Sequence, residues 1–227
     1  MTGNIKFEHI TIDEVRQSEE VITLLKAAEL HMKEKGYTEH SFRHVTLVAR
    51  TAGGILTKLG CDKREVELAE IAAYLHDIGN AINRVDHAHT GAILAYQILK
   101  DMGMGFEEAT QIMLAIGNHD EESGAAVSNI SAALILADKS DVHRSRVNNS
   151  DFATFDIHDR VNYAVESSEM NLDIINKTVK LELRIDTEIC PVMDYFEIFL
   201  GRMTMNRRAA AYLGLTFQLI INDSILL

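Results

Sequence analysis

The chain has 227 residues, of which 22 are Lys or Arg and 34 are Asp or Glu, so its formal net charge is −12 with neutral histidines. A chain this acidic repels the phosphate backbone of a long nucleic acid, which argues against a nucleic-acid scaffold unless a local basic patch intervenes. Hydrophobic residues make up 47% and charged residues 25%, the balance of a folded protein, and the length fits one large domain with or without a small addition.

Apolar residues recur with helical spacing in the first part of the chain. Thr11 and Glu14 have the spacing of a capping box, and they predict the start of a first long helix that ends near Gly36. A second helix is predicted over residues 41–59 and a third over residues 63–78.

Further helices are predicted over residues 87–102, 106–118 and 125–143, separated by glycine-containing breakers. Pro191 is the single proline of the chain, so little interrupts helix formation before it. Residues 1–150 are therefore predicted to be mostly α-helical.

The pattern changes after about residue 150. Residues 178–185 alternate between apolar and polar, which is the period of a half-buried strand. Further strands are predicted over residues 161–165 and 216–221, with a helix from Pro191 to about residue 213. Residues 151–227 are therefore predicted to form a small α+β element, an antiparallel sheet with one covering helix.

Five metal-capable side chains lie on or beside the apolar helix stripes, where a purely structural sequence would place Leu or Ala. They are His44, His76, His87, His119 and Asp138. A single inward histidine is most often a hydrogen-bonded core residue, but five inward polar groups on separate helices are costly to bury unless a cation compensates them. With Asp77 as a second carboxylate, this mixed nitrogen and oxygen set suits a divalent Fe, Mn, Zn, Co or Ni ion.

The same residues stand in a distinctive order and context. In chain order these are His44, Leu75-His76-Asp77-Ile78-Gly79, His87 followed by Gly91 and Ala92, Ala115-Ile116-Gly117-Asn118-His119, and Leu136-Ala137-Asp138-Lys139. Over about residues 38–147, this set resembles the HD-domain superfamily of metal-dependent phosphohydrolases.

The resemblance implies a helical HD bundle whose metal ligands converge from several helices. By position, the ligands of one metal ion would be His44, His76, Asp77 and Asp138. His87 and His119 match the additional ligands of two-metal members, in which Asp77 bridges the ions as the catalytic carboxylate. Asn80 stands where the HD-GYP cyclic-dinucleotide phosphodiesterases usually have Lys, no Gly-Tyr-Pro follows His119, and Asp120 replaces a second histidine. These departures disfavour that activity and leave one or two ions open.

Hydrolysis of a phosphate ester needs a nucleophile at neutral pH and neutralisation of the phosphoryl oxygens, and metal ions supply both. Lys139, His143 and Arg146 are spaced i, i+4 and i+7, so on one helix face they are candidates to bind substrate phosphate. A solvated basic face at a helix end explains the same spacing equally well. Arg84 and Asn80, near the His-Asp turn, are weaker candidates.

Between residues 85 and 138 the only basic residue is Lys100. This negative stretch favours metal loading and disfavours long nucleic acids. Its individual carboxylates, among them Glu121 and Glu122, are expected to be solvated helix surface.

The start of the chain lacks the patterns of a signal or transit peptide, and no apolar run is long enough for a membrane span. The two cysteines, Cys61 and Cys190, provide no disulfide framework and are expected to be small apolar side chains. A cytoplasmic protein is the expectation, without membrane partners.

The sequence thus predicts a metal-dependent phosphohydrolase that cleaves a phosphomonoester or phosphodiester bond of a small, nucleotide-like substrate with metal-activated water. The alternative is a non-catalytic HD-type sensor or interaction module that binds metal or nucleotide. The full ligand set favours the enzyme, and the negative charge disfavours an RNA-processing nuclease. The C-terminal sheet could bind a partner, shape the pocket or form a homodimer, and the sequence does not decide between these roles.

Overall fold

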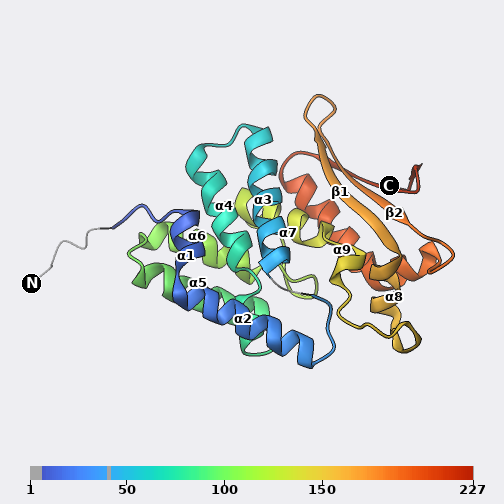
Figure 1. Cartoon of the computed structure of the whole chain (residues 1–227). Coiled ribbons are helices and arrows are strands. Elements are labelled where there is room, and N and C mark those ends of the chain that lie inside the picture. Colours follow the sequence, from blue (N-terminus) through green and yellow to red (C-terminus); the bar gives the residue numbers. More distant parts are fainter. Residues whose placement is uncertain (1–6, 40–41, 227) are drawn as a thin grey trace, which may run out of the picture.

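Helices occupy most of the first 164 residues and a sheet follows them, as the computed structural model shows for residues 7–39 and 42–226 (Figure 1). The α-helices are α1 (Ile12–Gln17), α2 (Glu19–Glu34), α3 (Phe42–Leu59), α4 (Lys63–Leu75), α5 (His87–Asp101), α6 (Phe106–Gly117), α7 (Asn129–Ser140), α8 (Ile157–Ala164) and α9 (Val192–Tyr212). The strands are β1 (Val165–Asp173), β2 (Thr178–Ile185), β3 (Thr216–Ile221) and β4 (Ser224–Ile225). Short 3-10 helices are η1 (Ile78–Ala81), η2 (Arg144–Arg146) and η3 (Phe152–Thr154). The mostly α fold class with a small C-terminal α+β element is confirmed.

The predicted first helix is two helices. The capping box of Thr11 and Glu14 is present at the start of α1, but α1 ends at Gln17. Ser18 has extended backbone angles, and its side chain accepts a hydrogen bond from the N–H of Val21, so it caps the start of α2. Serine is among the best N-cap residues, and it starts a new helix where the apolar stripe alone predicts continuity.

The middle helices follow the predictions, with shorter ends. Helices α5 and α6 are confirmed to within a residue at each end, and α3 ends at Leu59 as predicted, while its predicted first residue, Ser41, lies outside the described residues. Helix α4 ends at Leu75 and the chain tightens into η1. Helix α7 begins at Asn129 because Ser128 forms a capping box there, and it ends at Ser140.

The C-terminal sheet has the order β1-β2-β3-β4, and it is mixed where the sequence predicts an antiparallel one. Strands β1 and β2 are antiparallel, but β3 runs parallel to β2, with Thr178 opposite Thr216. Helix α9 connects β2 to β3, and a helical crossover returns the chain in the same direction.

The strand predicted over residues 161–165 is wrong. Residues 157–164 form α8, and β1 starts at Val165. Asp156 accepts a hydrogen bond from the N–H of Asp159, so an N-cap sets the local structure despite the alternating apolar residues.

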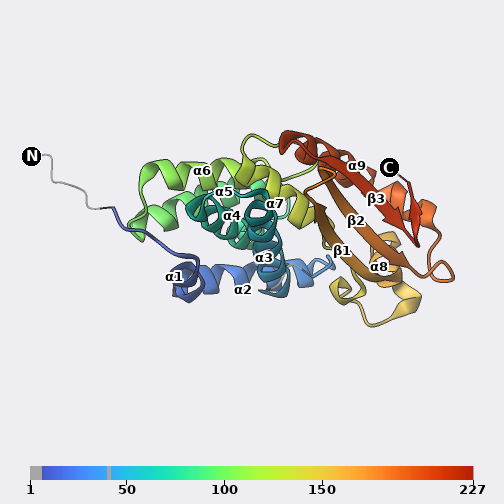
Figure 2. The ribbon, with the colours of Figure 1, turned by 90° about the horizontal axis from the view of Figure 1, so that it is seen from above.

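Helices α1–α7 lie on one side of the molecule, and the sheet lies on the other with α8 and α9 (Figures 1 and 2). A single cluster of buried apolar residues continues from α1 through α7 and α9 to β3. The predicted division at residue 150 therefore crosses a shared core. Among the described residues, no helix is long and apolar enough to cross a membrane. Neither Cys61 nor Cys190 forms a disulfide.

Candidate metal centre

Six predicted ligands meet in the middle of the helical part. His44 comes from α3, His76 and Asp77 follow α4, His87 starts α5, His119 follows α6 and Asp138 belongs to α7. All six are buried. They form three overlapping triads whose ligand atoms lie within 4.8 Å of one another, namely His44/His76/Asp77, His76/His119/Asp138 and Asp77/His87/His119. The structure thus brings together side chains that are up to 94 positions apart (138 − 44).

Each of the four imidazoles is held through its Nδ1 atom. Three of the acceptors are backbone carbonyls three residues earlier in the chain, Ala73 for His76 at 2.7 Å, Arg84 for His87 at 3.1 Å and Ile116 for His119 at 2.6 Å. The acceptor for His44 is the Asp141 carboxylate, at 2.7 Å. Because a carbonyl oxygen only accepts, Nδ1 carries the proton in the first three rings, and in the neutral ring Nε2 then presents a lone pair to the centre.

The Nε2 atoms of these rings face one another in pairs. The distance is 3.3 Å between His44 and His76, and 3.2 Å between His87 and His119. Two nitrogen lone pairs at such a distance repel unless a positive charge, a proton or a metal ion, lies between them. Metal-binding histidines have the same arrangement, because one ring nitrogen donates a hydrogen bond to an acceptor and the other faces the metal. The residues therefore fit a divalent metal.

Asp77 lies between the two histidine pairs. Its Oδ2 is 3.6 Å from Nε2 of His44 and 3.4 Å from Nε2 of His76, while its Oδ1 is 3.6 Å from Nε2 of His87. Asn80 donates a hydrogen bond to the same Oδ1 at 2.7 Å and so fixes the carboxylate plane. One oxygen thus faces each group of ligands.

Charges around the centre set the protonation states. Burial lowers the pKa of His76, but the carboxylates of Asp77 and Asp138 outweigh it and raise the pKa to about 10. Burial lowers the pKa of His87, and burial together with cationic neighbours holds the pKa of His119 well below its usual value. Burial opposes ionisation of Asp138, yet Lys139 holds the pKa of this carboxyl well below its usual range. Asp138 is therefore ionised and attracts positive charge, whereas the raised pKa of His76 keeps a proton on its Nε2 that a metal ion would have to displace.

Asp141 is a site residue that the sequence reasoning missed. Besides His44 it binds Arg43, whose Nη2 lies 2.9 Å from Oδ2. An aspartate directly after α7, where the helix dipole disfavours a carboxylate, is the signal in the sequence that could have found it.

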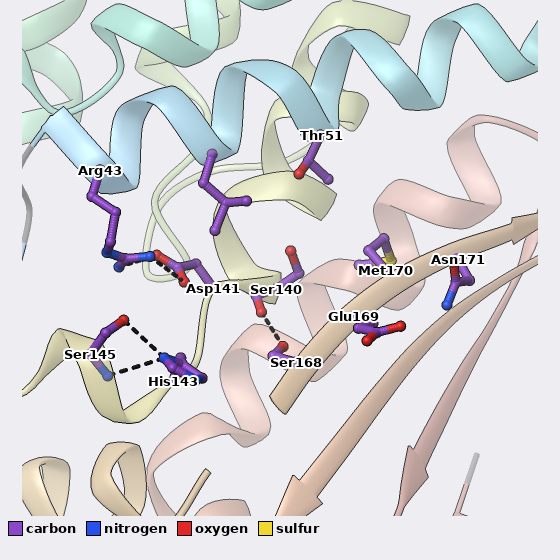
Figure 3. A pocket seen from close by; sticks show the side chains of 11 residues that line it. Arg43, Thr51, Ser140, Asp141, His143, Ser145, Ser168, Glu169, Met170 and Asn171 are labelled. Carbon is purple, nitrogen blue, oxygen red and sulfur yellow. Dashed lines mark hydrogen bonds and ion pairs between the residues drawn. The ribbon is translucent and has the colours of Figure 1, made fainter. Parts of the chain in front are cut away.

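Asp141 also lines a pocket outside the ligand cluster, shown in Figure 3. The pocket has a volume of about 480 Å³, and it lies between α3, the end of α7 and strand β1. Ser168 of β1 donates a hydrogen bond to the Ser140 carbonyl at 2.5 Å. Residues of the C-terminal sheet thus pack beside the residue that orients His44.

Lys139, His143 and Arg146 do not share a helix face, so that prediction is wrong. Helix α7 ends at Ser140, and His143 is the N-cap of η2. Nε2 of His143 donates to the Glu166 carbonyl at 3.1 Å, away from the centre.

Arg146 is buried and its guanidinium donates to the carbonyls of Glu39 and Asp141. Lys139 is buried as well, with Nζ 2.8 Å from Oδ2 of Asp138. Both line a cavity beside the ligands, whereas His143 lines the pocket of Figure 3.

Arg84 and Asn80 lie where the sequence predicts them, next to the His-Asp turn. Nη1 of Arg84 donates to Nε2 of His87 at 3.1 Å and lies 3.9 Å from Oδ1 of Asp77. A metal ion bound by Asp77, His87 and His119 would therefore have to displace this guanidinium from Nε2.

Two further charged residues complete the surroundings, and the sequence reasoning missed the role of both. Glu121, expected on a solvated helix surface, lies in the connection between α6 and α7, and its Oε2 is 2.6 Å from Nζ of Lys139. Arg202 of α9 has its Nε 3.4 Å from Oε1 of Glu121. The sequence signal for Glu121 is its place two residues after His119, whereas Arg202 has none, because only the fold brings α9 to the centre.

Comparisons with known proteins give one family model and two similar proteins. Residues 39–145 match the family model described as HD domain, a range that includes all six ligands. Uncharacterized protein MJ1020 of Methanocaldococcus jannaschii is 29% identical over 157 residues, which cover 59% of this chain and 60% of that relative. The chain thus matches less than two thirds of that relative's length. The crystal structure of a predicted HD superfamily hydrolase from an uncultured Thermotogales bacterium is 25% identical, covering 59% of this chain and 75% of that one with a TM-score of 0.43.

Proposed function

We propose that the chain, whose residues 39–145 match the HD domain family model, is a metal-dependent phosphohydrolase of the HD-domain superfamily. The substrate class is a small phosphorylated, nucleotide-like molecule with a phosphomonoester or phosphodiester bond. The cofactor is one or two divalent ions of Fe, Mn, Zn, Co or Ni. The observation that carries the proposal is the two facing pairs of Nε2 atoms, with the Asp77 carboxylate between them and Asp138 beside the first pair.

The residues of the chain hold and orient the reacting groups. His44, His76, Asp77 and Asp138 would hold one ion, and Asp77 with His87 and His119 a second. When bound, a divalent ion lowers the pKa of a coordinated water and neutralises phosphoryl oxygens. Asn80 fixes the carboxylate of Asp77, the catalytic residue of this proposal.

Metal content tests the ligand assignment. The purified chain should contain at least one transition metal per molecule, and Asp77→Ala or His76→Ala should remove it. His87→Ala should lower the metal content, whereas His89→Ala, on the same helix with an imidazole that is 57% exposed, should leave it unchanged. A folded wild-type chain that takes up no metal from a buffered supply would contradict the proposal.

A hydrolysis screen separates the enzyme from the sensor. Phosphomonoesters, phosphodiesters and nucleotides should be tested with Mn, Fe, Co, Ni and Zn in turn, with Asp77→Asn as the inactive reference. Turnover that depends on metal and on Asp77 supports the enzyme. Metal binding without turnover across the panel would favour the non-catalytic module instead.

A further inference from the structure

Cationic side chains surround the small cavity beside the metal centre. They are Arg84, Lys139, Arg146 and Arg202. Two of them are paired with one internal carboxylate, because Glu121 lies 2.6 Å from Nζ of Lys139 and 3.4 Å from Nε of Arg202. Lys139 in turn contacts the ligand Asp138 at 2.8 Å. Glu121 is therefore an anion held between two cations, and one of these cations, Lys139, also contacts a predicted metal ligand.

We propose that Glu121 occupies the place of the substrate's phosphate, and that Lys139 and Arg202 bind this phosphate once the Glu121 side chain has moved away. This inference rests on the proposed function only in taking the phosphate to belong to a substrate of that enzyme. The binding of phosphate itself is a separate property of the site.

The cavities on either side of Glu121 support this assignment. The cavity beside the ligands has a volume of about 10 Å³, which is room for one water molecule and too little for a phosphoryl group. Two larger pockets adjoin it, of about 260 Å³ and about 380 Å³, and Arg84 and Glu121 line both of them. Glu121 thus lines both larger pockets while it pairs with Lys139 and Arg202, which line the small cavity, so a displaced Glu121 would leave these two cations free to bind an anion that enters from the pockets.

The chemistry of the two anions explains why a phosphate would displace the carboxylate. A phosphomonoester carries nearly two negative charges and three acceptor oxygens, whereas a carboxylate carries one charge and two oxygens. Charge-assisted hydrogen bonds from Lys and Arg to phosphate are strong, and a guanidinium binds it through two N–H groups. The geometry therefore favours a terminal phosphomonoester over a phosphodiester, which bears a single charge.

Arg202 brings the C-terminal part of the chain into this site. Its guanidinium lies over the ring of Phe199, with the Cζ atom 4.4 Å from the ring centroid, so packing fixes its position. Helix α9 packs against α7, which carries Asp138 and Lys139. The α+β element thus supplies a phosphate ligand that the HD domain alone lacks.

Titration of inorganic phosphate into the full chain tests the proposal. Isothermal calorimetry measures the phosphate affinity, once with chelator-treated protein and once with zinc-loaded protein. Glu121→Gln should bind phosphate about tenfold more tightly than wild type, because the competing charge is gone. The matched control is Glu122→Gln, which removes the same charge from the exposed neighbouring residue and should change the affinity little. Equal gains in both variants, or no gain in Glu121→Gln, would overturn the proposal.

Arg202→Gln provides a second, independent variant. It should bind phosphate about tenfold more weakly than wild type, and the double variant with Glu121→Gln should lie between the two single ones. An unchanged affinity in Arg202→Gln would refute the role of α9. If phosphate binds as expected while the hydrolysis screen stays negative, the phosphate site stands and the phosphohydrolase proposal fails.

Discussion

The histidines of the candidate metal centre differ in how their rings are held. His76, His87 and His119 each donate from Nδ1 to a carbonyl three residues earlier, so the local backbone at a helix end fixes the ring. His44 depends on the side chain of Asp141, which is 97 residues away in the chain. His44 is thus the ligand whose orientation depends on long-range packing.

Asp141→Asn should weaken metal binding about 10-fold to 100-fold, the usual effect of losing a charged partner of a metal-binding histidine. The amide can still accept the hydrogen bond from His44, but it no longer stabilises positive charge on the ring or pairs with Arg43. A competition titration with a fluorescent chelator at neutral pH measures the affinity. Asp101→Asn, an exposed carboxylate on α5, is the control.

Thermal unfolding of the metal-free variant separates a loss of affinity from a loss of fold. An Asp141→Asn chain that unfolds normally and binds metal as tightly as wild type would show that Asp141 does not orient the ligand.

At the level of single residues, the sequence predicts five of the six candidate ligands because polar groups on apolar stripes conflict with ordinary helix patterning, and it adds Asp77 as the neighbour of His76. The prediction that Lys139, His143 and Arg146 share a helix face is wrong because α7 ends at Ser140. Nothing in the spacing of these residues marks that end. Arg202 could not be predicted from the sequence, since its approach to Glu121 depends on how α9 packs.

Among the elements, the contact between η1 and α5 positions ligands on both sides. A Cβ atom on Gly79 would lie 2.1 Å from the carbonyl oxygen of His87 and 2.6 Å from the N of Gly91. Both neighbours are backbone atoms and cannot rotate away. Glycine at this position therefore allows the His76-Asp77 turn to lie against the start of α5.

Gly79→Ala should lower the free energy of unfolding by about 3 kcal/mol and reduce metal content, because η1 and α5 must separate. The control is Gly54→Ala in α3, where a Cβ atom meets nothing within 4 Å. There alanine should stabilise the helix by about 0.5 to 1 kcal/mol. Urea unfolding of both variants measures the difference, and a fully stable, metal-loaded Gly79→Ala chain would contradict the role of this contact.

Helices α4 and α6 are joined by an ion pair at their N-terminal ends. Nε of Arg64 donates to Glu108 at 2.7 Å, and the two side chains are 19% and 29% exposed. The hydrogen bond from Arg64 lowers the pKa of Glu108 below its ordinary value. Since the folded-state pKa is the lower one, the pair stabilises the fold at neutral pH and loses this contribution as the pH falls through the folded-state pKa.

Glu108→Gln should therefore lower the free energy of unfolding by about 1 kcal/mol at pH 7, and the difference from wild type should shrink below about pH 4. Glu107→Gln, the exposed neighbour, should have little effect at either pH. Urea unfolding at a series of pH values gives both numbers. A deficit for Glu108→Gln that is constant with pH would rule out an ionic contribution.

The elements also show where sequence patterns reach their limit. Strand β2 alternates between apolar and polar residues, and its predicted range matches its observed bounds. The polar strand β1 was missed because none of its residues beyond Val165 is fully buried. The parallel pairing of β3 is not a property of any one strand. It follows from the path of α9, which strand periodicity does not record.

Over the whole molecule, the candidate metal centre lies in the helical part, but the shared core and Arg202 connect it to the C-terminal α+β element. Buried apolar residues continue from α1 through α7 and α9 into β3 as one cluster. The negative charge of −12 is offset at the centre by Lys139 and the arginines around it. The predicted boundary at residue 150 follows a change in sequence pattern, whereas packing is continuous across it.

A continuous core predicts that the chain unfolds as one cooperative unit. Calorimetry of the metal-free protein should show a single transition whose calorimetric and van't Hoff enthalpies agree. Leu56→Ala in α3 and Leu181→Ala in β2 remove equal side chains that are both 0% exposed, one from each part, and each should cost about 3 kcal/mol. In one cooperative unit both substitutions lower the same transition. Two transitions, each sensitive to only one substitution, would instead establish independent domains over residues 1–150 and 151–227, with Arg202, the proposed phosphate ligand, supplied across their interface.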